Sequence, residues 1–170
     1  MIFELKFSWL RIAIGLVLGL IAAVYILDAF QTMRIADQRG KQKRAMREIK
    51  TAAFAVQDFI RDHHGCPPQV DETVKEGWKY SSVKLIERQL APEYIAELPT
   101  TDPWGNPYVY GADLQTGSFC FVSMGKDGKR DSMLLPSLLT KTSCFENDII
   151  WSGNAFLQVP EGKQGFCGGK

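Results

Sequence analysis

The chain has 170 residues, enough for one compact domain with an appendage. Apolar residues make up 45% and charged residues 23%, an ordinary globular composition that does not by itself identify a membrane protein. The formal net charge of +1 excludes a global electrostatic bias toward nucleic acid or an acidic partner. Any partner has to be argued from local patches of the sequence.

The first predicted element is a membrane-spanning helix at residues 7–27. This run contains one charge, Arg11, and a span needs ~20 mostly apolar residues to match the hydrocarbon thickness. The side chains of Lys6 and Arg11 can extend to the near interface. A cleaved signal peptide would end in a small-x-small site, whereas this run continues through Asp28 into more helical sequence. A buried core helix is the alternative, but it seldom lacks a polar stripe over so many residues.

Two signals disagree about the side of the membrane on which the rest of the chain lies. More basic residues follow the span than precede it, which by the positive-inside rule favours a cytoplasmic location. The four cysteines all lie beyond the span, and their even number suits two disulfides in an oxidising compartment. They are Cys66, Cys120, Cys144 and Cys167. Buried free thiols are the alternative; we expect an external domain.

A helix is predicted to continue from the span through residues 28–64. Apolar residues recur after it at alternating spacings of three and four, which is typical of one buried helical face. They are Met46, Ile49, Ala53, Val56 and Ile60. Gly40 costs a helix about 1 kcal/mol relative to alanine but does not forbid it. His64 and Gly65, followed by two prolines, are predicted to end the helix.

Residues 65–170 are predicted to form one globular domain that starts with a loop at residues 67–80. Ser81 or Ser82 is expected to cap a short helix that ends at Pro92. Turn-forming residues are dense in the stretch that follows this helix. A shaped loop is therefore expected there.

Aromatic and β-branched residues at 108–110 and 118–123 predict a β-hairpin, and the sequence from Gly125 onward is expected to be loop-like. A helix with one apolar stripe and a small sheet bury their apolar surfaces most simply against each other. The sequence thus predicts an α+β fold in which a long N-terminal helix packs on a small antiparallel sheet.

The shaped loop at residues 98–108 reads Leu-Pro-x-x-Asp-Pro-Trp-Gly-Asn-Pro-Tyr. It resembles the signature of the major pseudopilins of type II secretion systems, within the pilin-like superfamily. The residues that carry the resemblance are Pro99, Asp102, Pro103, Trp104, Gly105, Asn106, Pro107 and Tyr108. Weaker similarity extends over most of residues 45–151.

The resemblance implies a pilin-like fold and a structural role in protein export. Subunits of that family stack by their N-terminal helices into a short periplasmic filament that works with an outer-membrane channel. The implied partners are other pseudopilin-like subunits and inner-membrane components of the secretion system. The implied location is the bacterial inner membrane, with residues 1–6 in the cytoplasm and the C-terminal domain in the periplasm.

The N-terminus departs from the family pattern. Family members carry a glycine, then phenylalanine and Thr-Leu-Ile-Glu, and a membrane peptidase cleaves after the glycine and methylates the new terminus. Here Lys6 precedes Phe7, Trp9 follows, and Arg11 takes the place of the glutamate. That glutamate pairs with the N-terminus of a neighbouring subunit, which an arginine would repel. The alternative function is an unprocessed, stand-alone periplasmic binding or docking module with a pseudopilin fold.

The resemblance also implies a calcium site in the C-terminal loop, where the family uses aspartates and backbone carbonyls. Asp127 and Asp148 stand at the matching motifs, and Asn147 can contribute a further oxygen. The intervening segment looks longer than in the family and begins with Lys129 and Arg130, which weaken a cation site. Two solvated loop aspartates are the alternative interpretation.

Other kinds of site are not expected. His63 and His64 lie close to Cys66, but a tetrahedral zinc site needs four convergent ligands and no paired Cys-x-x-Cys supports one. No serine stands in a nucleophile elbow, so the protein is not expected to be an enzyme. The basic run at residues 39–44 lacks interleaved aromatics, so nucleic acid is not an expected partner. An anionic membrane surface or an acidic partner subunit suits that run better.

Overall fold

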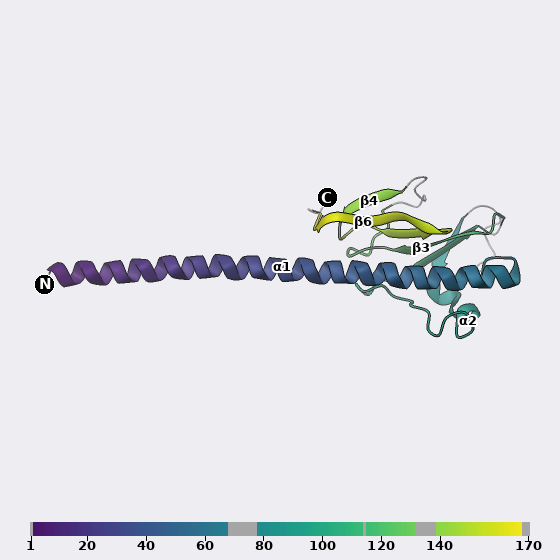
Figure 1. The fold of residues 1–170 in the computed structure, drawn as a ribbon, viewed down its shortest axis with the longest axis horizontal. Coiled ribbons are helices and arrows are strands. Elements are labelled where there is room, and N and C mark those ends of the chain that lie inside the picture. Colours follow the sequence, from purple (N-terminus) through teal and green to yellow (C-terminus); the bar gives the residue numbers. More distant parts are fainter. Residues whose placement is uncertain (1, 68–77, 114, 132–138, 168–170) are drawn as a thin grey trace. The chain divides into compact units, whose positions relative to one another are not determined.

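The computed structural model describes residues 2–67, 78–113, 115–131 and 139–167, with side chains from residue 13 onward. The chain divides into two compact units, Met1–Asp37 and Gln38–Lys170. The elements are α1 (Ile2–His63), β1 (Lys79–Ser82), the 3-10 helix η1 (Val83–Leu85), α2 (Glu87–Leu90), β2 (Val109–Asp113), β3 (Ser118–Ser123), β4 (Thr140–Cys144), β5 (Ile149–Ser152) and β6 (Ala155–Gly165) (Figure 1).

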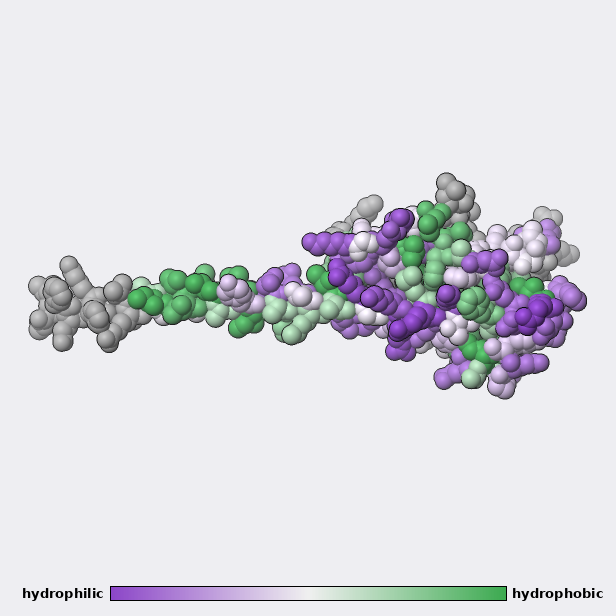
Figure 2. All heavy atoms as spheres, viewed as in Figure 1, coloured by the Kyte–Doolittle hydropathy of each residue, from purple (hydrophilic) through white to green (hydrophobic). Residues whose placement is uncertain are grey.

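In the first unit, α1 exposes its apolar side chains. Leu16 and Leu20 are 70% and 71% exposed, and their apolar neighbours from residue 13 to residue 27 are also exposed. Figure 2 shows this segment as a mostly hydrophobic surface. Within the described residues, one helix is long and apolar enough to cross a membrane, and it is the part of α1 from Ala13 to His63. The predicted continuous helix is confirmed.

The C-terminal end of α1 lies where the sequence predicts it. His64 has a φ of 56°, in the left-handed region, and its N–H donates a hydrogen bond of 2.8 Å to the carbonyl of Ile60. The residue that follows the last turn of a helix often adopts this left-handed conformation, and it is usually a glycine. Here a histidine adopts the left-handed conformation one residue before Gly65.

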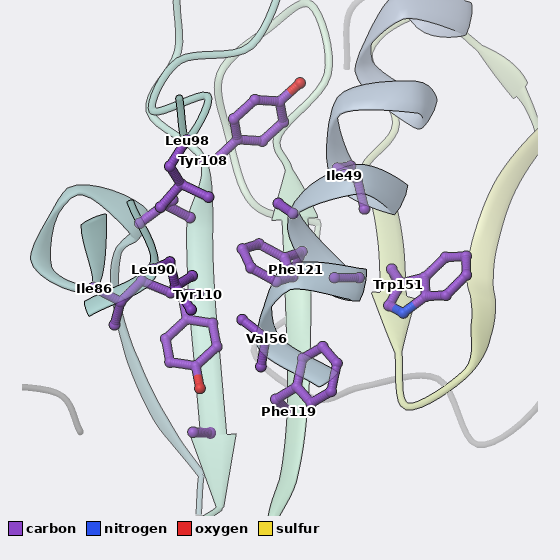
Figure 3. Close-up of a cluster of buried hydrophobic side chains, with 14 of the residues drawn as sticks. Ile49, Val56, Ile86, Leu90, Leu98, Tyr108, Tyr110, Phe119, Phe121 and Trp151 are labelled. Carbon is purple, nitrogen blue, oxygen red and sulfur yellow. The ribbon is translucent and has the colours of Figure 1, made fainter. Parts of the chain in front are cut away.

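In the second unit, the predicted apolar stripe of α1 packs on one face of the sheet. Ile49 and Val56 lie beside Phe119, Phe121 and Trp151 in the core (Figure 3). Complete burial of such a side chain contributes about 1.5–3 kcal/mol of hydrophobic stabilisation. The segment of η1 and α2 covers the same core with Val83, Ile86 and Leu90. The α+β fold is therefore as predicted.

The sheet has six strands in the order β1-β2-β3-β5-β6-β4. The predicted hairpin is present as the antiparallel pair β2 and β3, with Tyr110 opposite Phe121. The sheet is mixed, however, and not antiparallel as predicted, because β4 pairs parallel with β6. The chain leaves β4, enters β5 and then returns along β5 as β6, so that β6 runs in the same direction as β4.

The loops predicted at residues 67–80 and after Gly125 are wrong where β1, β4, β5 and β6 form. β6 contains Pro160 and Gly162, residue types that are depleted in strands, and β4 is polar throughout. Pairing with neighbouring strands overrides these weak local preferences. The rest of the first loop, residues 68–77, lies outside the described residues.

The predicted short helix is present in two pieces. Ser82 is the N-cap of η1, and its side chain accepts a hydrogen bond from the amide of Lys84. Ser81, the other candidate cap, lies within β1. α2 follows and ends before Pro92, as the sequence predicts.

One disulfide joins Cys144, at the end of β4, to Cys167, just beyond β6. The expected second disulfide is not formed, and Cys66 and Cys120 are buried free thiols. Cys66 belongs to the core on the α1 side of the sheet, whereas Cys120 packs with Val122 in a separate cluster. Because neighbouring side chains of a strand point to opposite faces, the sheet separates these two thiols.

Candidate functional site

The loop at residues 98–108 is organised around the buried carboxylate of Asp102, which is 4% exposed. Oδ1 of Asp102 accepts hydrogen bonds from the amides of Trp104 and Asn106, at 3.0 and 2.9 Å. Oδ2 accepts a bond of 2.8 Å from the hydroxyl of Ser123 in β3. A buried charge is costly unless it is hydrogen-bonded, and here three donors satisfy it. Asp102 therefore holds the loop closed and ties it to the sheet.

The remaining signature residues shape the turn. Gly105 has a φ of 92°, which glycine adopts without strain, and its amide donates to the carbonyl of Asp102. Pro103 begins the turn, and Pro107 forms an isolated antiparallel bridge with Thr101. Pro99 lines a cleft of about 620 Å³ beside α1.

Asn106 connects the signature loop to the turn that follows β3. Its Nδ2 donates a hydrogen bond of 2.8 Å to the carbonyl of Gly125. A Cβ at Gly128, where φ is 65°, would lie 2.6 Å from Oδ1 of Asn106. The two loops are thus in close contact, and the C-terminal loop begins from a fixed position.

Two residues of the signature loop bind α1 directly. Nε1 of Trp104 donates a hydrogen bond of 2.7 Å to Oε1 of Gln38. The hydroxyl of Tyr108 donates a bond of 2.8 Å to Oε2 of Glu48, whose Oε1 is paired with Arg44 at 2.6 Å. Burial and the neighbouring Glu48 carboxylate raise the pKa of Tyr108, so the phenol remains a donor. The signature loop is a brace between helix and sheet.

A second cluster of polar residues lies where the C-terminal loop meets β5. Asp148 is fully buried, and its Oδ2 accepts a hydrogen bond of 3.1 Å from the amide of Asp131. Oδ2 of Asp131 accepts in return from the amide of Asp148, at 3.0 Å. The same oxygen accepts from Nδ2 of Asn147 and Nε2 of Gln158. The neighbouring residues Asn147 and Asp148 thus both contact Asp131, a partner that sequence reasoning missed.

The other oxygen of Asp148 has no hydrogen-bond donor among the described residues. Burial raises the pKa of Asp148 to about 7, and the charges of Asp131 and Asp127 act in the same direction. The amide of Asp131 and the positive charge of Arg130 oppose this shift. Asp127, the third predicted residue, is exposed and accepts a hydrogen bond from the amide of Lys129. An unpartnered, buried carboxylate oxygen with acidic neighbours suits a hard cation.

No group of three or more metal-ligating side chains is preassembled in the residues for which side chains are described. His63, which stands at the end of α1, stacks on Phe59 and lies 3.2 Å from the hydroxyl of Tyr94. Phe7, Trp9 and Arg11 lie in α1, and their side chains are outside the described part of the chain.

The model of the type II secretion system (T2SS) protein G family matches residues 33–136 of this chain, which is more than half of it. The chain belongs to this family. The matched region contains the signature loop and the part of α1 that the loop braces. The predicted family resemblance is therefore confirmed.

Two curated relatives of this T2SS protein G family member are both type II secretion system core protein G. That of Xanthomonas campestris pv. campestris is 30% identical over 119 residues, covering 67% of this chain and 74% of the relative. That of Pseudomonas aeruginosa is 33% identical over 116 residues, covering 66% of this chain and 76% of the relative. No solved structure matches the chain.

The family match leaves two parts of this chain outside. Residues 1–32, with Arg11 and the predicted anchor, precede the match, and residues 137–170 follow it. The second part contains β4, β5 and β6, the disulfide and Asp148. Family membership thus rests on the braced helix and the signature loop.

Proposed function

We propose that this chain is a membrane-anchored, pseudopilin-like structural subunit of a type II secretion apparatus. The observation that carries the proposal is the combination of an exposed apolar stretch of α1 with a domain of the protein G family. Its role is to assemble, through the N-terminal helix, with other pseudopilin-like subunits and with inner-membrane components that support protein export. No catalytic step is part of this function.

The exposed leucines, isoleucines and valines of residues 13–27 support the membrane part of the proposal. In water, such a continuous apolar surface is unfavourable, at roughly 25 cal/mol per Å². Lipid chains remove that cost, and the stretch with residues 7–12 is long enough to span the hydrocarbon. The segment thus serves as a permanent anchor of the bacterial inner membrane.

The disulfide supports a periplasmic location for the second unit. Cys144 and Cys167 are bonded, and such bonds persist in oxidising compartments such as the bacterial periplasm. This argument outweighs the positive residues that follow the span, because a domain of this size translocates largely regardless of charge.

The signature loop explains how the domain can bear load within an assembly. Gln38 and Glu48 of α1 are held by Trp104 and Tyr108, and Asp102 fixes the same loop to β3. A force applied to the helix is therefore passed to the sheet through these hydrogen bonds as well as through the core. A rigid connection is what a subunit that stacks by its helix requires.

A second candidate function is an unprocessed, stand-alone docking module of the periplasm. Lys6 and Arg11 favour it, because they replace the glycine and glutamate on which processing and stacking in the family depend. In this case the anchor would hold one copy near the membrane, and a partner would bind the domain.

Mass spectrometry of the intact protein from native membranes separates the two functions. A processed subunit is expected to lack residues 1–6 and to carry a methyl group on Phe7. A stand-alone module is expected to retain residues 1–6, in which case stacking of the family type is overturned.

Crosslinking then tests assembly itself. Single cysteines placed within residues 7–27 of a variant lacking Cys66 and Cys120 should form dimers and longer ladders in the membrane if copies stack. The matched control places the cysteine at Gln115, on the exposed hairpin loop of the domain. Ladders that are equally strong at both positions would indicate random collision and contradict assembly through the helix.

We further propose that calcium binds at Asp148, with Asp131, Asp127 and Asn147 as neighbouring oxygen donors. The unpartnered Oδ1 of Asp148 and the raised pKa of this buried carboxylate support the fit, and Arg130 opposes it. A bound calcium ion would supply the positive charge that offsets the burial of the Asp148 carboxylate.

Thermal unfolding with calcium chloride or with a chelator tests this site. The wild type is expected to gain about 2.7 kcal/mol when calcium is at a hundred times its dissociation constant. Asp148→Asn keeps an acceptor for the amide of Asp131 but should lose the calcium response, whereas Asp113→Asn should retain it. A wild type that is equally stable under both conditions contradicts the site.

A further inference from the structure

The loop that presents Asp148 begins directly at a disulfide-bonded residue. Residues 145–148 connect β4 to β5, and Cys144 is the last residue of β4. The amide of Asn147 donates to the carbonyl of Cys144, which closes the loop into a turn. Asp148 is thus held from one side by β5, which starts at the next residue, and by Gln158, which donates to its carbonyl. From the other side it is held by this loop and by the end of β4.

β4 itself is held from one side. Within the described sheet it pairs with β6 alone, and that pairing is parallel with an irregularity between Thr142 and Cys144. Its residues are mostly exposed, so it buries little apolar surface. β4 is therefore held to β6 mainly by polar contacts, which include the hydrogen bond from Nε2 of Gln164 to the carbonyl of Thr142 and the ion pair of Lys141 with Glu161.

The disulfide closes the base of the loop against the end of β6. The Cα atoms of Cys144 and Cys167 are 5.4 Å apart. The amide of Cys167 donates a hydrogen bond of 2.9 Å to Oε2 of Glu146, and the amide of Phe145 donates one of 3.0 Å to the carbonyl of Gly165. Three links thus join Cys144 and the loop that follows it to the last residue of β6 and to Cys167 just beyond it.

The start of the loop between β4 and β5 also contacts the turn that carries Asp127. Nζ of Lys126 lies 3.6 Å from Oε1 of Glu146 and 4.3 Å from the ring centre of Phe166. The amide of Lys126 donates to the carbonyl of Phe145, whose ring packs on Phe166 at 5.1 Å. The turn that carries Asp127 and the loop between β4 and β5 therefore contact each other next to the residues that the disulfide joins.

From this arrangement we infer that the Cys144–Cys167 disulfide controls the cation site, holding Asp148 against Asp131 when it is closed and releasing them when it is reduced. The inference rests on the calcium proposal above and names how that site is regulated. Reduction by a dithiol breaks the S–S bond and delivers two electrons and two protons. It leaves two cysteine thiols and converts the reductant into its own disulfide.

Equilibrium dialysis with radioactive calcium on the full chain in detergent tests the inference. The calcium dissociation constant is measured for the oxidised wild type, for the wild type in excess dithiothreitol, and for C144S/C167S. Reduction or substitution is expected to raise the calcium dissociation constant by about tenfold or more, the effect of losing an outer support of a metal site. C66S, which removes a buried free thiol, is the matched control and should bind like the wild type.

Hydrogen exchange gives a readout that does not depend on calcium. The amides of Asp131 and Asp148 donate to each other's carboxylates, so both are expected to exchange at least tenfold faster in the reduced protein, while Phe121 in the core stays protected. Unchanged exchange at Asp131 and Asp148 after reduction overturns the inference.

The outcomes separate the two proposals. If the oxidised wild type binds no calcium, the calcium proposal fails and exchange at Asp131 and Asp148 still decides whether the disulfide holds the loop. If it binds calcium and reduction leaves the affinity unchanged, control by the disulfide is overturned. Should C144S/C167S fail to fold, the reduced wild type and Glu146→Gln, which weakens the link to Cys167, carry the same comparison.

Discussion

The hydroxyl of Tyr108 donates a hydrogen bond of 2.8 Å to Oε2 of Glu48, across 60 residues of sequence, and so joins the signature loop to α1. Glu48 also holds Arg44, which leaves the carboxylate with a partner on each oxygen. In the signature loop, the phenol of Tyr108 and the indole of Trp104 thus bind the helix, and the carboxylate of Asp102 binds the sheet.

Tyr108→Phe is expected to destabilise the fold by about 1.5–3 kcal/mol, the range for a hydrogen bond to a charged group. Urea unfolding of the full chain in detergent measures the change. Tyr94→Phe is the matched control, because the Tyr94 hydroxyl meets His63 on the surface and its loss should cost less than about 0.5 kcal/mol. Equal losses would show that the Tyr108 contact does not brace the helix.

Asp102→Asn is expected to be more damaging, at about 3 kcal/mol, because it turns one of two fully used acceptor oxygens into a donor. That NH₂ group would face either two amides or the hydroxyl of Ser123. Asp113→Asn, at the half-buried end of β2, serves as the control under the same unfolding conditions. A stable Asp102→Asn with native exchange at Asn106 would contradict the central place of this carboxylate.

Gly125→Ala tests the contact between the turn that follows β3 and the loop between β4 and β5. Both Gly125 and Gly153 have positive φ values, at 62° and 58°, so alanine costs about 1–2 kcal/mol at either position. A Cβ at Gly125 would also lie 2.6 Å from the carbonyl oxygens of Glu146 and Asn147, whereas none lies near Gly153. Thermal unfolding should therefore show a larger loss for Gly125→Ala than for Gly153→Ala. Equal losses would mean that the loops do not press on each other.

The free thiols should be inert in the folded protein. Burial raises the pKa of Cys66 and raises that of Cys120 to about 12, so at pH 8 the reactive thiolate is scarce at both. Iodoacetamide is expected to add no mass to the native chain and two carbamidomethyl groups after unfolding without reductant. Rapid modification of the native chain would show that these cysteines are accessible.

The sequence predicts the elements that local physics determines. The apolar spacing from Met46 to Ile60 locates the buried face of α1, and His64-Gly65 marks its end. The alternation of Phe119, Cys120 and Phe121 is a strand with two different faces. In each case the signal is carried by neighbours in sequence.

What sequence reasoning missed depends on residues far apart in the chain. β4 and β6 are polar or contain Pro160 and Gly162, and only their pairing makes them strands. Asp131 is hydrogen-bonded to Asp148 across 17 residues, and no sequence motif predicts this contact. The disulfide pairing could not be predicted from the sequence either, because strands far apart in the chain form the sheet that separates Cys66 from Cys120.

A topology reporter fused after Lys170 tests the central claim most directly. Alkaline phosphatase folds only in an oxidising compartment, so the fusion should be active and should remain in the membrane fraction until detergent is added. The account predicts both results, for a chain that is held in lipid by the start of α1 and folds outside the cytoplasm. An inactive fusion, or a chain that is soluble without detergent, would contradict it.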